Sequence, residues 1–560
     1  MQGINGEKGE PGKSAYEYAR EAGYEGTEEE FSNKLNGEYA LKSEIPSVDG
    51  FATEKHVDEA LSSHNSAVDA HSNMGWLTSE DEVASKPLPL DADTLGGHKA
   101  SYYVALDELH KYYLTADDIK SLIEVEVFKQ TLNLRNKYYY STLKAAVNDV
   151  NADTIGVNAD ATEDTAVAYA YVEDGKPVVG LLKDTTENKR IILSADMTIN
   201  LGGKTVTFEN DYLGIRGTAN AKINVTIDGR IKGSSVILNG IDGGGVTIKA
   251  YAGNHFTIIG GEYVINETVV NTMYAGVAIG CTGDGCFLTA KSCKAVAICY
   301  GASSAFDIRS TAVVSGCNAS AMSNDGDAEC VIVAGSLDIS NCNITASCTN
   351  GHSVGVRAVS TGTSVISNCD IRAYSPYYAD GDNYTAYSVG ISNIGTLTIN
   401  NCYVLGTHSG LQNKGTLYVN GGTFESYGHG GIYFAGEGTT AYVRNATLKD
   451  SLTMPEGWEG TSQHNGAGFY IGGGSNEKVY MDNCDIYGSA ASQMFVIKGS
   501  NNALYVSNST INNLTGGDTK IRIDGNNMMY LGVGNNFTAE NTSTPDNVIV
   551  TDEVYVQDAA

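Results

Sequence analysis

The chain has 560 residues, a formal net charge of −30, 65 glycines and only 8 prolines. This length exceeds one ordinary domain, so several modules are expected. The acidic balance argues against nucleic acid as a partner, because phosphate binding relies on clustered lysine and arginine. No apolar run is long enough to cross a bilayer, and the start of the sequence has no apolar signal region, so neither membrane insertion nor secretion is expected.

The first part of the chain predicts an elongated stem. Glycines at positions 3, 6, 9 and 12 form four Gly-X-Y triplets, a spacing that lets three chains close around one axis; a flexible glycine-rich leader is the alternative. Short helices, none apolar enough to fold alone, are expected to start at Thr27 and to span 53–64, 77–85 and 115–136. We therefore expect a homotrimer, with collagen-like triplets and short helices over 1–36 and a trimeric stem over 37–137.

A different pattern begins at residue 138. The segment 138–190 is expected to cap a solenoid, with an amphipathic helix over 140–147. Strands are expected over 154–157, 178–182, 191–193 and 197–201. The solenoid itself is expected over 191–545, and a C-terminal strand or tail over 546–560.

One short pattern recurs through the rest of the chain: apolar–x–apolar–polar–Asn–Cys–x–apolar. It is most complete at 365–371 (VISNCDI), 397–404 (LTINNCYV) and 479–486 (VYMDNCDI). When weaker copies are counted, successive centres lie 20 to 38 residues apart, a recurrence typical of a solenoid. Each copy alternates apolar and polar residues with a period of two, so the unit consists of strands. The sequence therefore predicts a mainly β protein built as a parallel β-helix.

Each coil is expected to hold three strands, and the bend between the second and the third strand is expected at the asparagine of the pattern. The asparagine before the cysteine tolerates the left-handed backbone of a sharp bend. These asparagines should stack as a ladder joined by their amides: Asn341, Asn368, Asn401, Asn445, Asn483 and Asn508. The cysteines that follow fall on one interior column: Cys293, Cys317, Cys342, Cys369, Cys402 and Cys484.

Two interpretations of the cysteine column are a metal or redox array and an inert stack of small buried side chains. No histidine or carboxylate partners converge on the column, which favours the inert stack. Free thiols for the 11 cysteines would fit synthesis in the cytoplasm.

Two sets of residues carry a family resemblance. The run 181–186 (LLKDTT), followed by 197–206 (MTINLGGKTV), resembles the opening of right-handed parallel β-helices of the pectate-lyase-like superfamily. In the stem, 9–17 (GEPGKSAYE) and 90–97 (LDADTLGG) resemble segments of phage tail fibres and tailspikes. The resemblance implies a homotrimer in the virion, attached to phage tail or baseplate proteins at its N-terminus, which contacts a bacterial surface glycan. No cofactor and no metal are expected; 380–383 (DGDN) could bind calcium but lacks the closing glutamate of the twelve-residue calcium loop.

Two long connections flank two short turns on one edge of the expected β-helix. The long ones span 373–388 and 449–466, and the short ones 406–409 and 426–430. Because neighbouring strands lie ~4.8 Å apart, the long connections would bound a depression about 14 Å across, enough for two or three sugar rings. Aromatic rings stack on sugars while polar groups bond to hydroxyls. The expected carbohydrate-binding residues are Tyr377, Tyr378, Tyr384, Tyr387, Tyr427, Tyr433, Trp458 and His464.

Catalysis at this edge is a further hypothesis, with solvated loops as the alternative for each residue. Glycoside hydrolysis needs two carboxyl groups about 5–9 Å apart. The candidates, drawn from the two long connections, are Asp380, Asp382, Glu456 and Glu459. A polysaccharide lyase would instead need a base, for which His408 and His429 are the candidates, and a nearby cation.

The sequence therefore predicts a trimeric phage tail fibre or tailspike that recognises a host cell-surface polysaccharide. A glycan depolymerase on the same scaffold, either hydrolase or lyase, is the first alternative. A bacterial surface adhesin is the second.

Overall fold

The computed structural model divides the chain into two compact units, Met1–Tyr113 and Leu114–Ala560. The residues that it describes are 94–95, 98–99, 137–209, 211–239, 245–267, 275–359, 362–375, 379–380, 383–384, 388–427, 430–450, 468–488, 495–513, 521–537 and 547–555. In the first unit they form one antiparallel pair, β1 (Thr94–Leu95) with β2 (His98–Lys99). The expected collagen-like triplets and stem helices lie outside the described residues.

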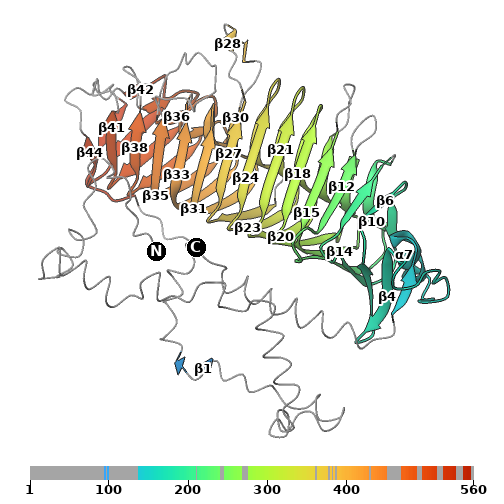
Figure 1. Cartoon of the computed structure of the whole chain (residues 1–560). Helices are drawn as coiled ribbons and strands as arrows, with labels where there is room; N and C mark the ends of the chain where they lie inside the picture. Colours follow the sequence, from blue (N-terminus) through green and yellow to red (C-terminus); the bar gives the residue numbers. More distant parts are fainter. Residues whose placement is uncertain are drawn as a thin grey trace, which may run out of the picture. The chain divides into compact units, whose positions relative to one another are not determined.

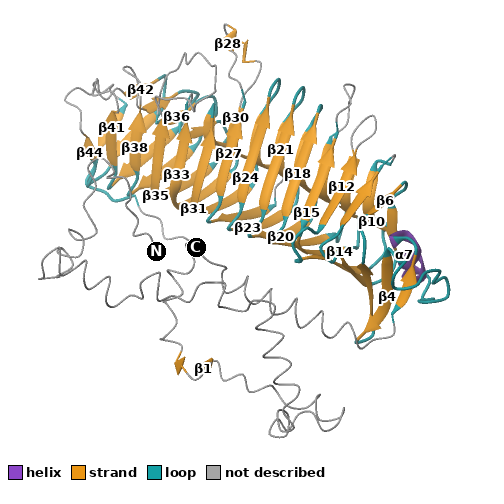
Figure 2. Ribbon diagram, viewed as in Figure 1, coloured by secondary structure: helices purple, strands orange, loops and turns teal. Residues whose placement is uncertain are grey.

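The second unit is mainly β, with its strands stacked as a parallel solenoid (Figures 1 and 2). One parallel sheet of 13 strands takes the first strand of each coil. Its members in spatial order are β7 (Ile191–Leu193), β10 (Leu213–Gly217), β13 (Gly245–Ala250), β16 (Gly276–Cys281), β19 (Ser303–Ile308), β22 (Ala328–Val333), β25 (Ser353–Ala358), β30 (Ser388–Asn393), β32 (Ser409–Asn413), β34 (Ile432–Phe434), β36 (Phe469–Ile471), β39 (Phe495–Ile497) and β42 (Ile521–Ile523).

A second sheet of 28 strands takes the other two strands of each coil, together with three strands of the cap described below. Second strands are β8 (Met197–Asn200), β11 (Asn224–Gly229), β14 (His255–Gly260), β17 (Phe287–Lys291), β20 (Thr311–Ser315), β23 (Ser336–Ser340), β26 (Thr363–Ser367), β37 (Lys478–Asp482), β40 (Ala503–Ser507), β43 (Met528–Leu531) and β45 (Val548–Val550). Third strands are β6 (Thr185–Glu187), β9 (Thr205–Phe208), β12 (Ser235–Asn239), β15 (Glu262–Asn266), β18 (Lys294–Cys299), β21 (Asn318–Ser323), β24 (Asn343–Cys348), β27 (Asp370–Tyr374), β38 (Asp485–Gly488), β41 (Thr510–Asn513) and β44 (Asn536–Phe537). Three strands run through the bend and serve as both: β31 (Thr396–Gly406), β33 (Thr416–Ser426) and β35 (Thr440–Asp450).

A helix and three strands close the first coil, at the end of the stack where Figure 1 labels α7 and β4. The elements are β3 (Tyr138–Tyr140), α7 (Leu143–Asn151), β4 (Ala168–Glu173) and β5 (Lys176–Leu181). The helix starts later than predicted because the residues up to Tyr140 pair with β4. Thr142 caps it, accepting the amide of Ala145 at 3.1 Å.

One predicted strand of the cap is wrong. Residues 154–157 form turns, because the carboxylate of Asp149 draws this segment back onto α7. Asp149 accepts the amide of Asn158 at 2.9 Å, and Gly156 adopts a positive φ of 93°. The strands expected over 178–182, 191–193 and 197–201 are confirmed as β5, β7 and β8.

The asparagine bends are confirmed. All six predicted asparagines have φ between 48° and 54°. The amide ladder is confirmed between Asn445 and Asn483, whose Nδ2 donates to Asn445 Oδ1 at 2.7 Å. Asn508 instead donates to Asp482 Oδ1 at 2.8 Å. The bend therefore comes from the backbone preference of asparagine, and the bonds between amides vary along the stack.

The cysteine column is buried, and its six thiols are free, as predicted. Sulfurs accept backbone amides from the preceding coil: Cys369 N donates to Cys402 Sγ, and Cys342 N to Cys369 Sγ, each at 3.4 Å. Burial raises the pKa of Cys484 to about 12, so this thiol stays protonated. The column is thus a row of buried free thiols whose sulfurs bond to the neighbouring backbone.

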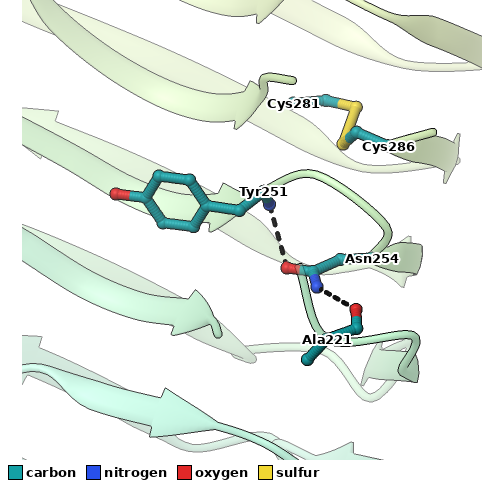
Figure 3. The surroundings of a disulfide bond; sticks show 5 residues. All are labelled: Ala221, Tyr251, Asn254, Cys281 and Cys286. Carbon is teal, nitrogen blue, oxygen red and sulfur yellow. Dashed lines mark hydrogen bonds between the residues drawn. A yellow bond between two sulfur atoms is a disulfide. The ribbon is translucent and has the colours of Figure 1, made fainter. Parts of the chain in front are cut away.

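The expectation that every cysteine is a free thiol is wrong for one pair. Cys281, at the end of β16, and Cys286, just before β17, form a disulfide with their Cα atoms 6.1 Å apart (Figure 3). The turn between them brings the two residues together on one coil. Beside it, Asn254 ties neighbouring turns by accepting the Tyr251 amide at 2.9 Å and donating to Ala221 O at 2.8 Å. The repeat pattern concerned cysteines on different coils and gave no sign of this local pair.

Candidate functional site

The predicted edge exists as a set of turns between the third strand of one coil and the first strand of the next. His408 lies between β31 and β32, and Tyr427 follows β33. Hydrogen bonds join successive turns: His408 N donates to Ser388 O at 2.9 Å, and Thr407 Oγ1 to Ser375 O at 3.2 Å. A backbone bond and a buried hydroxyl thus link the turns of neighbouring coils, and the His408 side chain between them is half-buried.

Few of the predicted site residues can be placed. The first long connection holds an antiparallel pair, β28 (Ala379–Asp380) with β29 (Asn383–Tyr384), whose side chains are not described. His408 Nδ1 lies 3.1 Å from Ser409 Oγ. The residues outside the described part are Tyr377, Tyr378, Asp382, Tyr387, His429, Glu456, Trp458, Glu459 and His464.

Tyr427 and Tyr433, predicted to lie together, belong to different surroundings. Tyr433 is on β34 and packs on Tyr470, with ring centroids 5.3 Å apart, in an outer apolar cluster with Val496. Burial, followed by the charge of Glu425, raises the pKa of Tyr427. Tyr427 therefore belongs with the polar groups at the ends of the third strands.

These polar groups form what we call the Glu425 cluster: Arg372, Tyr403, Glu425, Tyr427 and Lys449. The Tyr403 hydroxyl donates to Glu425 Oε2 at 2.8 Å, and Lys449 Nζ lies 3.2 Å from Glu425 Oε1. The Arg372 guanidinium lies 5.2 Å from the centre of the Tyr403 ring. Strands β27, β31, β33 and β35 supply all of these side chains except Tyr427 in adjacent outward rows, because the strands pair in parallel register.

The charged groups of the Glu425 cluster are held in place by one another. Arg372 donates to both oxygens of Asp370, at 2.7 and 2.8 Å, and this bond raises its pKa. Burial and then the bond to Glu425 raise the pKa of Tyr403, which stays a neutral donor. The side chains of Arg372 and Lys449 remain 45% and 39% exposed, so the cluster offers fixed donors to solvent.

A second aromatic feature is a tyrosine ladder on the outward face of the second strands: Tyr418, Tyr442, Tyr480, Tyr505 and Tyr530. Successive ring centroids lie 5.5, 5.2, 4.6 and 4.6 Å apart, with ring planes inclined by only 9° to 13°. Each ring covers its neighbour's face, so the ladder presents edges and hydroxyls. By contrast, no aromatic ring among the described residues is stacked on Tyr403 or Tyr427. The Tyr403 ring has the Arg372 guanidinium over it instead.

Of these two features, sequence reasoning predicted only Tyr427 as a binding residue, although the repeat contains the signal for the other residues. The ladder occupies the x of apolar–x–apolar, which is tyrosine in five copies. Arg372, Glu425 and Lys449 occupy the position three residues after the cysteine or its substitute. Aligning the copies by the cysteine would have placed them in one row.

The described residues contain no group of three histidine, cysteine or acidic side chains that could hold a metal ion. Within the same residues, no helix is long and apolar enough to cross a membrane. No protein-family model, no curated protein and no solved structure matches the chain.

Proposed function

We propose that the protein is a receptor-binding protein of a phage tail, a trimeric tail fibre or tailspike that recognises a host cell-surface polysaccharide. The solenoid would be a right-handed β-helix, preceded by a collagen-like and helical stem. The observation that supports recognition of a polysaccharide is the Glu425 cluster. It combines two tyrosines, a carboxylate and two cations on the outer face of the solenoid, which is the combination that sugar sites use.

Binding without cleavage is favoured over hydrolysis at this cluster. A glycosidase needs one carboxyl group that holds a proton and a second that attacks or activates water. Glu425 is engaged by Tyr403 and Lys449, and Asp370 by Arg372. Both carboxylates thus have cation partners, which suits holding sugar hydroxyls. A depolymerase remains the alternative, with its acid pair drawn from the carboxylates of the two long connections.

The test is binding of the purified full chain to an array of bacterial polysaccharides. Tyr427→Ala and Glu425→Gln should weaken binding to the recognised glycan about 10- to 100-fold, the effect of a contact residue at a binding hot spot. Tyr442→Ala, on the tyrosine ladder of another face, is the matched control and should bind as the wild type does. Unchanged binding by all three variants would place the site elsewhere.

Two further measurements separate the alternatives. Release of reducing sugars or of unsaturated products from a bound glycan would identify a depolymerase, and its loss in Asp380→Asn or Glu456→Gln would assign the acid pair. Light scattering of the full chain should give a trimer. A monomer at micromolar concentration would contradict the trimeric fibre.

A further inference from the structure

A cavity of about 550 Å³ lies at the capped end of the solenoid, far along the stack from the Glu425 cluster. Its lining comes from separate elements: Lys144 and Asn148 from α7, Lys189 and Arg190 from the segment before β7, and Arg216 from β10. The helix is fixed there by Asn151, whose amide donates to Ile192 O at 2.7 Å and accepts Ser194 N at 2.8 Å. The cavity is therefore a built part of the cap.

Its charge is opposite to that of the whole chain. Four cationic side chains line it against a single carboxylate, Asp211, in a chain whose net charge is −30. The Asp211 carboxylate already has a partner within the protein. The backbone amide and the Nε of Arg190 both donate hydrogen bonds to Asp211 Oδ2 at 3.0 Å. Burial alone would raise the pKa of Asp211, but these bonds and the Arg190 charge hold it below its ordinary value. Lys144 interacts with the buried carboxylate of Glu187. Lys189 and Arg216 are therefore the cations that give the cavity its positive potential.

Arg216 is a cation of the cavity lining that has no carboxylate partner among the described residues. Its Nε is buried and has no hydrogen-bond partner. Among the described residues, no carboxylate pairs with Arg216 or Lys189, and the Arg216 guanidinium instead lies 5.8 Å from the centre of the Tyr251 ring. The charge of Arg216, a half-buried residue of the cavity lining, and that of the exposed Lys189 are therefore not neutralised by a carboxylate of the described chain, and a bound anion could neutralise them.

We propose that this cavity binds an acidic sugar, with its carboxylate or phosphate group held by Arg216 and Lys189. The cavity is larger than a bare ion needs and falls in the range of small-molecule sites. The exposed side chains of Tyr212 and Ile192 offer apolar surface beside the cations, and Asn148 offers an amide for hydroxyls. The inference rests on the proposed recognition of a host glycan and specifies acidic units as part of that glycan.

The experiment measures binding of the full chain to glucuronic acid, galacturonic acid, N-acetylneuraminic acid and glucose 6-phosphate by calorimetry or ligand-observed NMR. Glucose, galactose and inorganic phosphate are the comparison ligands. We expect at least one acidic sugar to bind at least tenfold more tightly than its neutral counterpart and than inorganic phosphate. The carboxylate and phosphate arms distinguish the two sources of the acid group.

Arg216→Gln and Lys189→Gln should each weaken that binding at least tenfold. Lys189 is exposed, so its variant keeps the test valid if Arg216→Gln impairs folding. The matched control is Arg522→Gln. Parallel register places Arg522 in the same outward row as Arg216, at the other end of the sheet. There Arg522 pairs with Asp524 at 2.9 Å. Replacing Arg522 should leave binding of the acidic sugar unchanged.

Three outcomes would overturn the proposal: no acidic sugar binds, inorganic phosphate binds as tightly, or Arg216→Gln and Lys189→Gln bind like the wild type. Host polysaccharide binding is measured on the same samples. If the wild type binds polysaccharide but the cavity variants do too, only the cavity proposal fails. If the wild type binds no polysaccharide at all, the proposed function fails.

Discussion

The first coils and the last coils of the solenoid share one interior plan and differ on their outer faces. In the second strands of the early coils, Thr226, Thr257 and Thr289 occupy one outward row. In the late coils, the corresponding positions hold the tyrosine ladder. The inward neighbours are apolar at both ends, for example Val225 early and Leu417 late. Inward positions thus determine the fold, and outward positions can change their chemistry at little cost.

The largest effect should come from the interior of the late coils. Phe469 is fully buried and packs on Phe434 and Phe495, with ring centroids 5.3 and 5.7 Å away. Phe469→Ala should lower the free energy of unfolding by about 3–5 kcal/mol, because it removes a large side chain and leaves a cavity. Denaturant unfolding measures this. A loss below 1 kcal/mol would mean that the coils tolerate interior cavities.

A buried acid should make the late coils sensitive to pH. Glu477 is 1% exposed, and burial raises its pKa to about 7, although Gly436 N and Thr439 Oγ1 donate to it. The folded state therefore holds this proton more tightly than the unfolded chain, whose carboxyl titrates near 4.5. The contribution to stability is complete below pH 4.5, declines as pH rises and is lost above about 7.

Glu477→Gln should remove this pH dependence while keeping an acceptor for Gly436 N. At pH 8 the variant should be more stable than the wild type by about 1–3 kcal/mol, the size expected for a shift of this order. At pH 4 the two proteins should unfold alike. Equal unfolding curves at both pH values would contradict a buried, protonated Glu477.

The outward tyrosines should matter less for stability. Tyr480 has partners on both sides in the ladder, at 5.2 and 4.6 Å. Tyr480→Ala should cost about 0.5–1.5 kcal/mol, the value of an aromatic pair beyond burial. Unfolding of this variant next to Phe469→Ala gives the contrast directly. If both cost the same, the division between interior and exterior roles is wrong.

The smallest expected effect concerns the cysteine column, whose thiols should not react with thiol reagents in the native protein. Cys369, Cys402 and Cys484 are 1–3% exposed, so thiol reagents should not label them in the native protein. Mass spectrometry after native labelling should find modification at these residues only when denaturant is present. Rapid native labelling would show that the stack opens readily.

The sequence predicted features that depend on one repeat at a time. The asparagine bends and the cysteine column follow from local backbone preference and from the two-residue period, and both are present. The Glu425 cluster needs the register between coils, which insertions of unequal length hide. The cationic cavity is harder still to foresee, because Lys144, Lys189 and Arg216 meet only through the docking of α7 on β7.

The fixed spacing of the strands also sets the distance between sites on different coils of the solenoid. Arg216 on β10 and the coil that holds Glu425 are separated by seven strand steps, from β10 to β32, or ~34 Å at the usual strand spacing. A polymer that touches both places must bridge this length, and its two contacts then reinforce each other through effective concentration. Duplicating or deleting one coil would change the interval by about 4.8 Å while both contact surfaces stay intact. The distance between the two contact surfaces and the residues that form them can therefore vary independently in such a molecule.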